Sequence, residues 1–300
     1  MSESMRGIGA MVGACLIWGL SPLYYDLLNG VPPGEVLAYR TVWSFAFFAA
    51  VLAFQGRIGK LREALGAPGR AGLILLSGLF IGVNWFGFIY AVHNDRALEA
   101  SLGYYVFPLM AVLVGRVVFG ERLAGLQWLA VGLAAGAVTL LTLGLGVPPW
   151  IALLLAVTFS LYGLMKKRLP AGPVVSVTAE VLLLSPIAII WIWARGTGPE
   201  LWEHGLLALS GPLTATPLIL FSYAAKRAKL STIGLVQYLN PTLQFFVAVL
   251  IFAEPFTLWH GIAFPAIWVA LTVYSVSAVA QDRSARRAVS SAATSRTAIT

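Results

Sequence analysis

The length and spacing of its apolar segments limit this chain more than any other feature. Apolar runs follow one another with short polar breaks between them, at 7–28, 36–55, 71–92, 97–118, 123–144, 147–165, 174–194, 206–225, 230–253 and 257–280. A helix needs about 20 residues to cross the ~30 Å hydrocarbon core of a bilayer, where every backbone polar group must be bonded internally. Hydrophobic residues make up 59% of the chain and charged residues 11%, unlike soluble proteins. We therefore predict an all-α integral membrane protein with ten transmembrane helices.

An internal repeat divides these ten helices into two halves. Four residues of the first half recur 133 positions later: Tyr90, Tyr105, Pro108 and Glu121 as Tyr223, Tyr238, Pro241 and Glu254. Each half holds five spans, an odd number, so the second half enters the membrane from the opposite side and the repeat is inverted. Inverted repeats are typical of secondary transporters, whose substrate site lies near the midplane where the repeats meet. We assign 1–145 and 146–281 to the repeats and 282–300 to a disordered cytoplasmic tail.

The basic residues predict the orientation of the chain. With the N-terminus in the cytoplasm, 17 of the 20 Lys and Arg residues lie in cytoplasmic segments, whereas Arg96 and Arg195 lie outside and Arg40 lies within a span. The positive-inside rule then places both termini in the cytoplasm. The net charge of +8 therefore indicates orientation and contact with anionic membrane lipids. Nucleic acid is not an expected partner.

Charged and amide side chains inside the spans are candidate functional residues, because burying a charge in lipid costs several kcal/mol. Arg40 either extends to the outer headgroups or is a cavity cation that meets a substrate carboxylate or bonds Glu180 through water. Glu180 is either a structural anchor or a carboxylate that carries a coupling proton. Asn84 is either a bond between helices or a ligand contact. Each residue keeps both interpretations on sequence alone.

The other candidates are amides and aromatic residues at similar depth. We expect Gln237 and Asn240 to give hydrogen bonds to a substrate, and Trp18, Trp85 and Tyr104 to supply apolar cavity walls. Packing in the core is the alternative for the aromatic residues.

Prolines within the spans predict irregular helix. Pro22 should loosen the outer third of the first span, and Pro108 and Pro241 form weak points related by the inversion. The double proline Pro212 and Pro217 predicts a broken or irregular eighth span and a second cavity wall. Broken helix at membrane depth is tolerated only where protein or water covers it.

Other functions have little support in the residues. A lipid-acting membrane enzyme would need paired carboxylates, or His and Ser placed to meet, but His93, His204 and His260 fall at predicted outer ends. Glu121 and Glu254 fall at opposite surfaces and are better interpreted as helix-end markers than as a catalytic pair. A single cysteine, Cys15, excludes an intramolecular disulfide and a thiolate metal cluster. We expect no catalysis, metal or cofactor; a non-transporting scaffold is the remaining alternative.

Several short segments together form a recognisable set: Tyr39-Arg40 with Trp43-Ser44, Asn84-Trp85, Glu99 to Tyr104, Leu213 to Leu218, and Ser231 to Gly234 followed by Gln237-Tyr238 and Pro241-Thr242. This set resembles the corresponding segments of the RarD-like permeases, in the EamA type of the drug/metabolite transporter (DMT) superfamily. The resemblance covers about residues 5–280, with small departures at Tyr39, where that family more often has His, and at Val106-Phe107. It implies ten helices, an inner-membrane location and export of a solute.

These observations predict a multi-pass permease of the bacterial inner membrane, a monomer or homodimer. It would export a small metabolite, amino acid or drug-like amphipath by alternating access. The first four and the sixth to ninth helices would line a central cavity, with the fifth and tenth at the periphery. A proton gradient or the substrate gradient alone would supply the energy.

Overall fold

Helices form the regular structure of the residues that the computed structural model describes, which are 2–66, 68–120, 123–146, 148–228 and 230–297. They are α1 (Glu3–Asp26), α2 (Pro33–Phe54), α3 (Ile58–Gly66), α4 (Arg70–His93), α5 (Ala97–Phe119), α6 (Gly125–Leu145), α7 (Trp150–Arg168), α8 (Pro173–Arg195), α9 (Leu201–Ala225), α10 (Leu230–Gln237), α11 (Leu239–Phe246), the π-helix η1 (Val247–Ile251) and α12 (Leu258–Thr297). Within these ranges nine helical segments are long and apolar enough to cross a membrane, and Trp150–Lys166 is a shorter apolar one. The predicted all-α membrane fold is confirmed.

The ten expected spans correspond to these helices with two differences. The ninth span is composite, because α10, α11 and η1 follow one another between residues 230 and 251. The short helix α3 lies in the basic loop between the second and third spans. At the other end of the chain, α12 continues as helix to Thr297, through most of the segment expected to be a disordered tail. Alanine is frequent there, and it is the residue that most favours helix.

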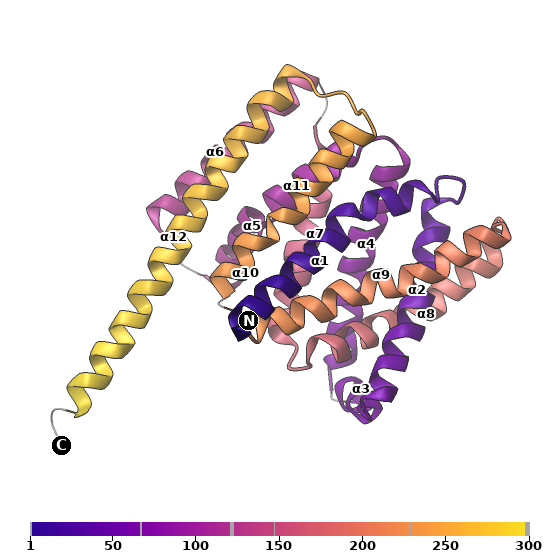
Figure 1. The fold of residues 1–300 in the computed structure, drawn as a ribbon, viewed down its shortest axis with the longest axis horizontal. Coiled ribbons are helices and arrows are strands. Elements are labelled where there is room, and N and C mark those ends of the chain that lie inside the picture. Colours follow the sequence, from indigo (N-terminus) through magenta and orange to yellow (C-terminus); the bar gives the residue numbers. More distant parts are fainter. Residues whose placement is uncertain (1, 67, 121–122, 147, 229, 298–300) are drawn as a thin grey trace.

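The helices pack in reciprocal pairs, as two related halves would. α1 packs against α9 as α4 packs against α7, and α2 packs against α9 as α8 packs against α4. α2 also packs along α8, and α6 along α12, so these two pairs join equivalent helices. In Figure 1, α6 and α12 form a pair at one edge, with α5, α10 and α11 between them and the other helices. This is the peripheral position expected of the fifth and tenth spans.

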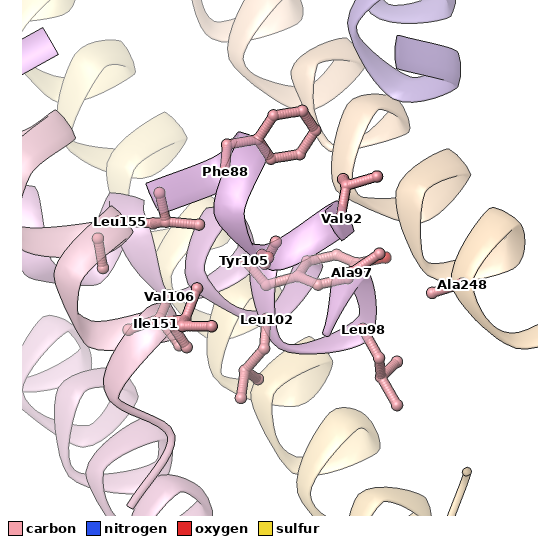
Figure 2. Close-up of a cluster of buried hydrophobic side chains, with 14 of the residues drawn as sticks. Phe88, Val92, Ala97, Leu98, Leu102, Tyr105, Val106, Ile151, Leu155 and Ala248 are labelled. Atoms are coloured by element: carbon pink, nitrogen blue, oxygen red, sulfur yellow. The ribbon is translucent and has the colours of Figure 1, made fainter. Parts of the chain in front are cut away.

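The main apolar core lies where α4, α5 and α7 meet. Figure 2 shows part of it, with Phe88 from α4, Val106 from α5 and Leu155 from α7 among the labelled side chains. Apolar burial does not by itself drive helices together in lipid, so close packing must hold them. Gly103 permits that packing, because a Cβ there would lie 2.8 Å from the carbonyl oxygen of Ala152 on α7.

The prolines interrupt the helices less than the sequence suggests. In α1, the carbonyl of Trp18 would normally bond the missing N–H of Pro22; it accepts instead from Ser21 Oγ at 2.6 Å and from Gln244 Nε2 of α11 at 3.4 Å. α9 runs unbroken from Leu201 to Ala225 through its double proline, so the expected break there is wrong. The interruption lies in the ninth span, at residue 238 between α10 and α11.

Candidate functional site

Arg40 lies inside the helix bundle, one to two turns into α2. It is 7% exposed, so it does not extend to the outer surface. Its Nε donates to Thr214 Oγ1 of α9 at 3.0 Å, and its guanidinium carbon lies 4.1 Å from the ring centroid of Trp85 and 5.6 Å from that of Tyr25. A cation–π contact stabilises a desolvated guanidinium by about 2 kcal/mol. Three helices besides α2 thus hold Arg40 in place.

A glycine on α9 brings Thr214 to Arg40. A Cβ at Gly211 would lie 2.6 Å from the carbonyl oxygen of Trp43 on α2, a distance that real side chains do not adopt. The two backbones can therefore cross in contact only because residue 211 has no side chain. Thr214 lies one turn further along α9, and its hydroxyl also donates to the carbonyl of Ser210 at 2.8 Å. The segment of α9 that holds Pro212 and Pro217 therefore forms one side of the Arg40 site, and it does so as continuous helix.

Asn84 joins three helices. Its Nδ2 donates to the carbonyl of Leu155 at 3.0 Å and to Thr158 Oγ1 at 3.1 Å, both on α7. Its Oδ1 accepts from the hydroxyl of Tyr104 on α5 at 3.1 Å. Asn84 is 1% exposed, and the amide is bonded at both ends to protein. In this conformation the Asn84 side chain hydrogen-bonds neighbouring helices to one another, which is one of the two roles expected from the sequence.

The Asn84 group and the Arg40 group adjoin one another. Trp85 of the Arg40 group directly follows Asn84 on α4. Phe88 also connects the two groups, because its ring centroid lies 5.8 Å from that of Tyr25 and 5.9 Å from that of Tyr104. The structure therefore brings four of the predicted residues, from α2, α4 and α5, into one region of the bundle. Tyr25 and Thr214 belong to the same region and were not among the predicted site residues.

A second polar group lies where α1 meets α11. Gln244 Nε2 donates to Asn240 Oδ1 at 3.1 Å as well as to the Trp18 carbonyl, so Trp18 and Asn240 share a partner. Gln237 is half-buried at the end of α10. No side-chain hydrogen bond joins Gln237 to the other described residues. Gln244 was not predicted, although an amide one turn beyond Asn240 was a signal for it.

Glu180 is bonded to residues other than Arg40. Its Oε1 accepts from Lys166 Nζ at 2.7 Å and from Ser77 Oγ at 2.7 Å, and Tyr162 donates to Oε2 at 3.4 Å. The carboxylate is 1% exposed and the lysine side chain 23% exposed. Ser176 also accepts from Lys166. This group joins α4, α7 and α8, and the described residues contain no ion pair between Arg40 and Glu180.

Lys166 was missed because it begins the run Lys166-Lys167-Arg168, which is typical of a cytoplasmic helix end. A nearby cation stabilises a buried carboxylate, so a lysine on a neighbouring helix was the available signal. Lys166 lies near the end of α7, close to the start of α8, which carries Glu180.

The predicted residues pack against protein and do not line the hollows found at the surface. A hollow of about 540 Å³ lies between α6 and α12, lined by apolar residues such as Trp128, Gly132 and Ile262. A smaller one of about 50 Å³ lies near Arg96 and His260. The central cavity thus stays a prediction.

The end of the ninth span caps another helix. Glu254 accepts from the backbone N–H groups of Ala97 and Leu98, at 2.7 and 2.8 Å, at the start of α5. A carboxylate at a helix N-terminus bonds free N–H groups and interacts favourably with the helix dipole. Burial nevertheless raises the pKa of Glu254 above its ordinary value. Its role at a helix end agrees with the sequence interpretation; its repeat mate, Glu121, lies outside the described residues.

Three comparisons relate the chain to known proteins. Residues 5–143 match the EamA-like transporter family. Protein RarD from Streptomyces exfoliatus is 41% identical over 97% of this chain and 95% of the relative. An uncharacterized transporter from Pseudomonas aeruginosa is 41% identical over 91% of this chain and 94% of the relative. A solved protein structure with 20% sequence identity superposes with a TM-score of 0.61, covering 90% of this chain and 96% of that one, and so shares the fold.

Proposed function

Because the chain belongs to the EamA-like transporter family, as a RarD-like permease of the drug/metabolite transporter superfamily, we propose that it is a secondary transporter that exports a small amphipathic metabolite, amino acid or drug. Its membrane is the bacterial inner membrane, with both termini in the cytoplasm. The positions of its basic residues support that orientation, since 17 of 20 fall in the segments that would then be cytoplasmic.

The observation that carries this proposal is the Arg40 group. A guanidinium held among aromatic rings inside the membrane is costly to bury and serves as a ready site for a negatively charged group of a substrate. Trp85 and Tyr25 supply apolar faces beside it. The group lies where α2 and α9, from different repeats, cross in backbone contact.

Transport would proceed by alternating access. The bonds that join helices of the two repeats, such as those of Asn84 to α7 and of Gln244 to α1, would exchange for others as the repeats rock. Two related halves in opposite orientation have inward-open and outward-open forms of similar energy. Asn84, Gln237 and Asn240 would then bond the substrate in the forms that expose them.

Transport assays in proteoliposomes test the proposal. A panel of amino acids and amphipathic drugs, with and without a proton gradient, should contain compounds that cross only in vesicles with the protein. Arg40→Ala should abolish that flux and Asn84→Ala should reduce it. The matched control is Arg195→Ala, because Arg195 is exposed at the end of α8. Unchanged flux in a folded Arg40→Ala protein would contradict the assignment of the site.

Orientation is tested separately with reporters fused within the loops. A reporter in the loop that follows α7, at residues 169–172, should be cytoplasmic, and one after Arg195 should be external. The reverse result would contradict the inverted repeat in the proposed orientation.

A further inference from the structure

Building on the proposed export function, we propose that the exported molecule carries one net negative charge, a carboxylate bound at Arg40, and that the membrane potential drives its export without a coupling proton.

Glu180 and Lys166 form an ion pair with N···O 2.7 Å, and two oxygens and one ammonium of this pair are further bonded by Ser77, Tyr162 and Ser176. The pair has no net charge, and its groups are well supplied with partners. Breaking such a pair would leave a buried charge and cost several kcal/mol. Glu180 therefore has its countercharge in Lys166 and is bonded in place by protein groups.

Arg40 has no such compensation. Among the described residues, no carboxylate lies within the 4.0 Å of Arg40 that an ion pair requires. Thr214 accepts the Nε hydrogen, and the faces of Trp85 and Tyr25 contact the guanidinium, but neither a hydroxyl nor an aromatic ring neutralises it. A guanidinium has five N–H donors; Thr214 accepts one of them, and the Tyr25 side chain also hydrogen-bonds the guanidinium. Arg40 is thus a buried positive charge without an ion-pair partner among the described residues.

The complementary ligand is a monocarboxylate with an aromatic or apolar body. A carboxylate accepts two parallel hydrogen bonds from a guanidinium, which adds geometric selectivity to the charge attraction. A zwitterion would also bring an ammonium group close to the positive charge of Arg40, and the carboxylate of Glu180 is already bonded to Lys166. A cation would be repelled by Arg40. The charge inventory therefore ranks an anion above a zwitterion and a zwitterion above a cation.

The energy source follows from the charge of the substrate. A bacterial membrane is negative inside, so a monovalent anion moves outward down the potential. About 100 mV sustains roughly a 50-fold concentration ratio of such an anion. That driving force requires no proton, because the charge of the anion itself couples its export to the potential.

Three compounds with the same benzyl group test the charge preference: N-acetylphenylalanine as anion, phenylalanine as zwitterion and phenylalaninamide as cation. In detergent, the anion should raise the unfolding temperature of the protein and the cation should not. Arg40→Gln should abolish this shift, whereas Arg195→Gln, which changes an exposed arginine, should leave it intact. If Arg40→Gln does not fold, Arg40→Lys keeps the charge but loses the planar fork, and should weaken binding of the anion at least about tenfold.

The driving force is tested in proteoliposomes loaded with N-acetylphenylalanine. A potassium gradient with valinomycin sets the potential, and a pH gradient is applied independently. Efflux should speed up when the interior is made negative and slow down when it is made positive, with no response to the pH gradient at a fixed potential. Flux that follows the pH gradient and ignores the potential would overturn the proposal. So would equal binding of zwitterion and anion.

The two proposals fail in different ways. If the anion binds at Arg40 but crosses no faster than in empty vesicles, the anion site is supported and the export function is contradicted. If phenylalanine or its amide crosses through the protein and N-acetylphenylalanine does not, the export function is supported and the anion site is overturned.

Discussion

Arg40 and Glu180 hold equivalent places in the two repeats: each lies seven residues after the proline that begins its helix, Pro33 in α2 and Pro173 in α8. Each also bonds a hydroxyl on a helix of the other repeat, Thr214 for Arg40 and Ser77 for Glu180. In the proposed inverted repeat, the two residues would lie in opposite halves of the membrane. Their difference is that Glu180 has an ion-pair partner and Arg40 has none among the described residues.

Removing the hydroxyl that accepts from Arg40 should destabilise the protein. Thr214→Val keeps the shape of the side chain and leaves the buried Nε–H without its partner. Hydrogen bonds to charged groups contribute about 1.5–3 kcal/mol, and we expect a loss of that size in the free energy of unfolding. Unfolding in mixed detergent micelles measures it. Thr216→Val, at a half-buried threonine on the same helix, is the control and should change stability by less than about 0.5 kcal/mol.

The ion pair between Lys166 and Glu180 should show strong coupling in a double-mutant cycle. Lys166→Met leaves the carboxylate of Glu180, which is 1% exposed, without a countercharge, and should cost about 3–5 kcal/mol in the free energy of unfolding. Glu180→Gln should cost less, because the lysine side chain is 23% exposed and reaches solvent. The double variant should recover most of the loss of Lys166→Met. Additive effects would show that the two side chains do not interact.

The sequence predicts the fold well because the bilayer permits so few alternatives. Backbone groups in hydrocarbon must be bonded within a helix, so apolar runs of sufficient length predict the ten spans directly. The same logic identifies Arg40, Asn84 and Glu180, since each is polar at a depth where polarity is costly. Their partners could not be predicted in this way. Which hydroxyl faces Arg40 depends on the angle at which α2 crosses α9. The residue pattern of either helix alone does not predict that crossing angle.

Irregular helix was the least predictable feature. Proline marks where a backbone bond is missing, but neighbouring groups decide whether the helix breaks. In α1, the carbonyl freed by Pro22 is bonded by Ser21 and by Gln244 of another helix, so the helix continues. α9 likewise continues as helix through its two prolines, whereas the ninth span is interrupted near Pro241.

Adding a single methyl group at Gly211 should disrupt the crossing of α2 and α9. The Cβ of Gly211→Ala would lie 2.6 Å from the carbonyl oxygen and 2.9 Å from the carbonyl carbon of Trp43, and backbone atoms cannot move aside as a flexible side chain can. Overpacking of this kind costs about 1–3 kcal/mol in the free energy of unfolding. Gly205→Ala on the same helix meets nothing within 4 Å, and should be neutral or stabilising by up to about 1 kcal/mol. Equal effects of the two substitutions would contradict the contact.

Glu254 should give the protein a pH dependence of known sign. Burial raises its pKa, Asp95 and Glu99 raise it further, and the hydrogen bonds from the N–H groups of Leu98 and Ala97 offset only part of the rise. The folded protein therefore binds the Glu254 proton more tightly than the unfolded chain does. The stabilisation from this difference is complete below the ordinary carboxyl pKa of about 4.3 and is lost as the pH rises through the raised value.

Glu254→Gln isolates this contribution from every other titrating group, because glutamine does not titrate. The unfolding temperatures of the wild type and the variant, measured from pH 4 to pH 7, should differ in a pH-dependent way. The wild type should lose stability relative to the variant as the pH rises, even though its carboxylate still accepts from the N–H groups of Ala97 and Leu98. A relative gain with rising pH would mean that the helix N-terminus outweighs burial and lowers the pKa of Glu254. A constant difference would mean that burial and the hydrogen bonds balance.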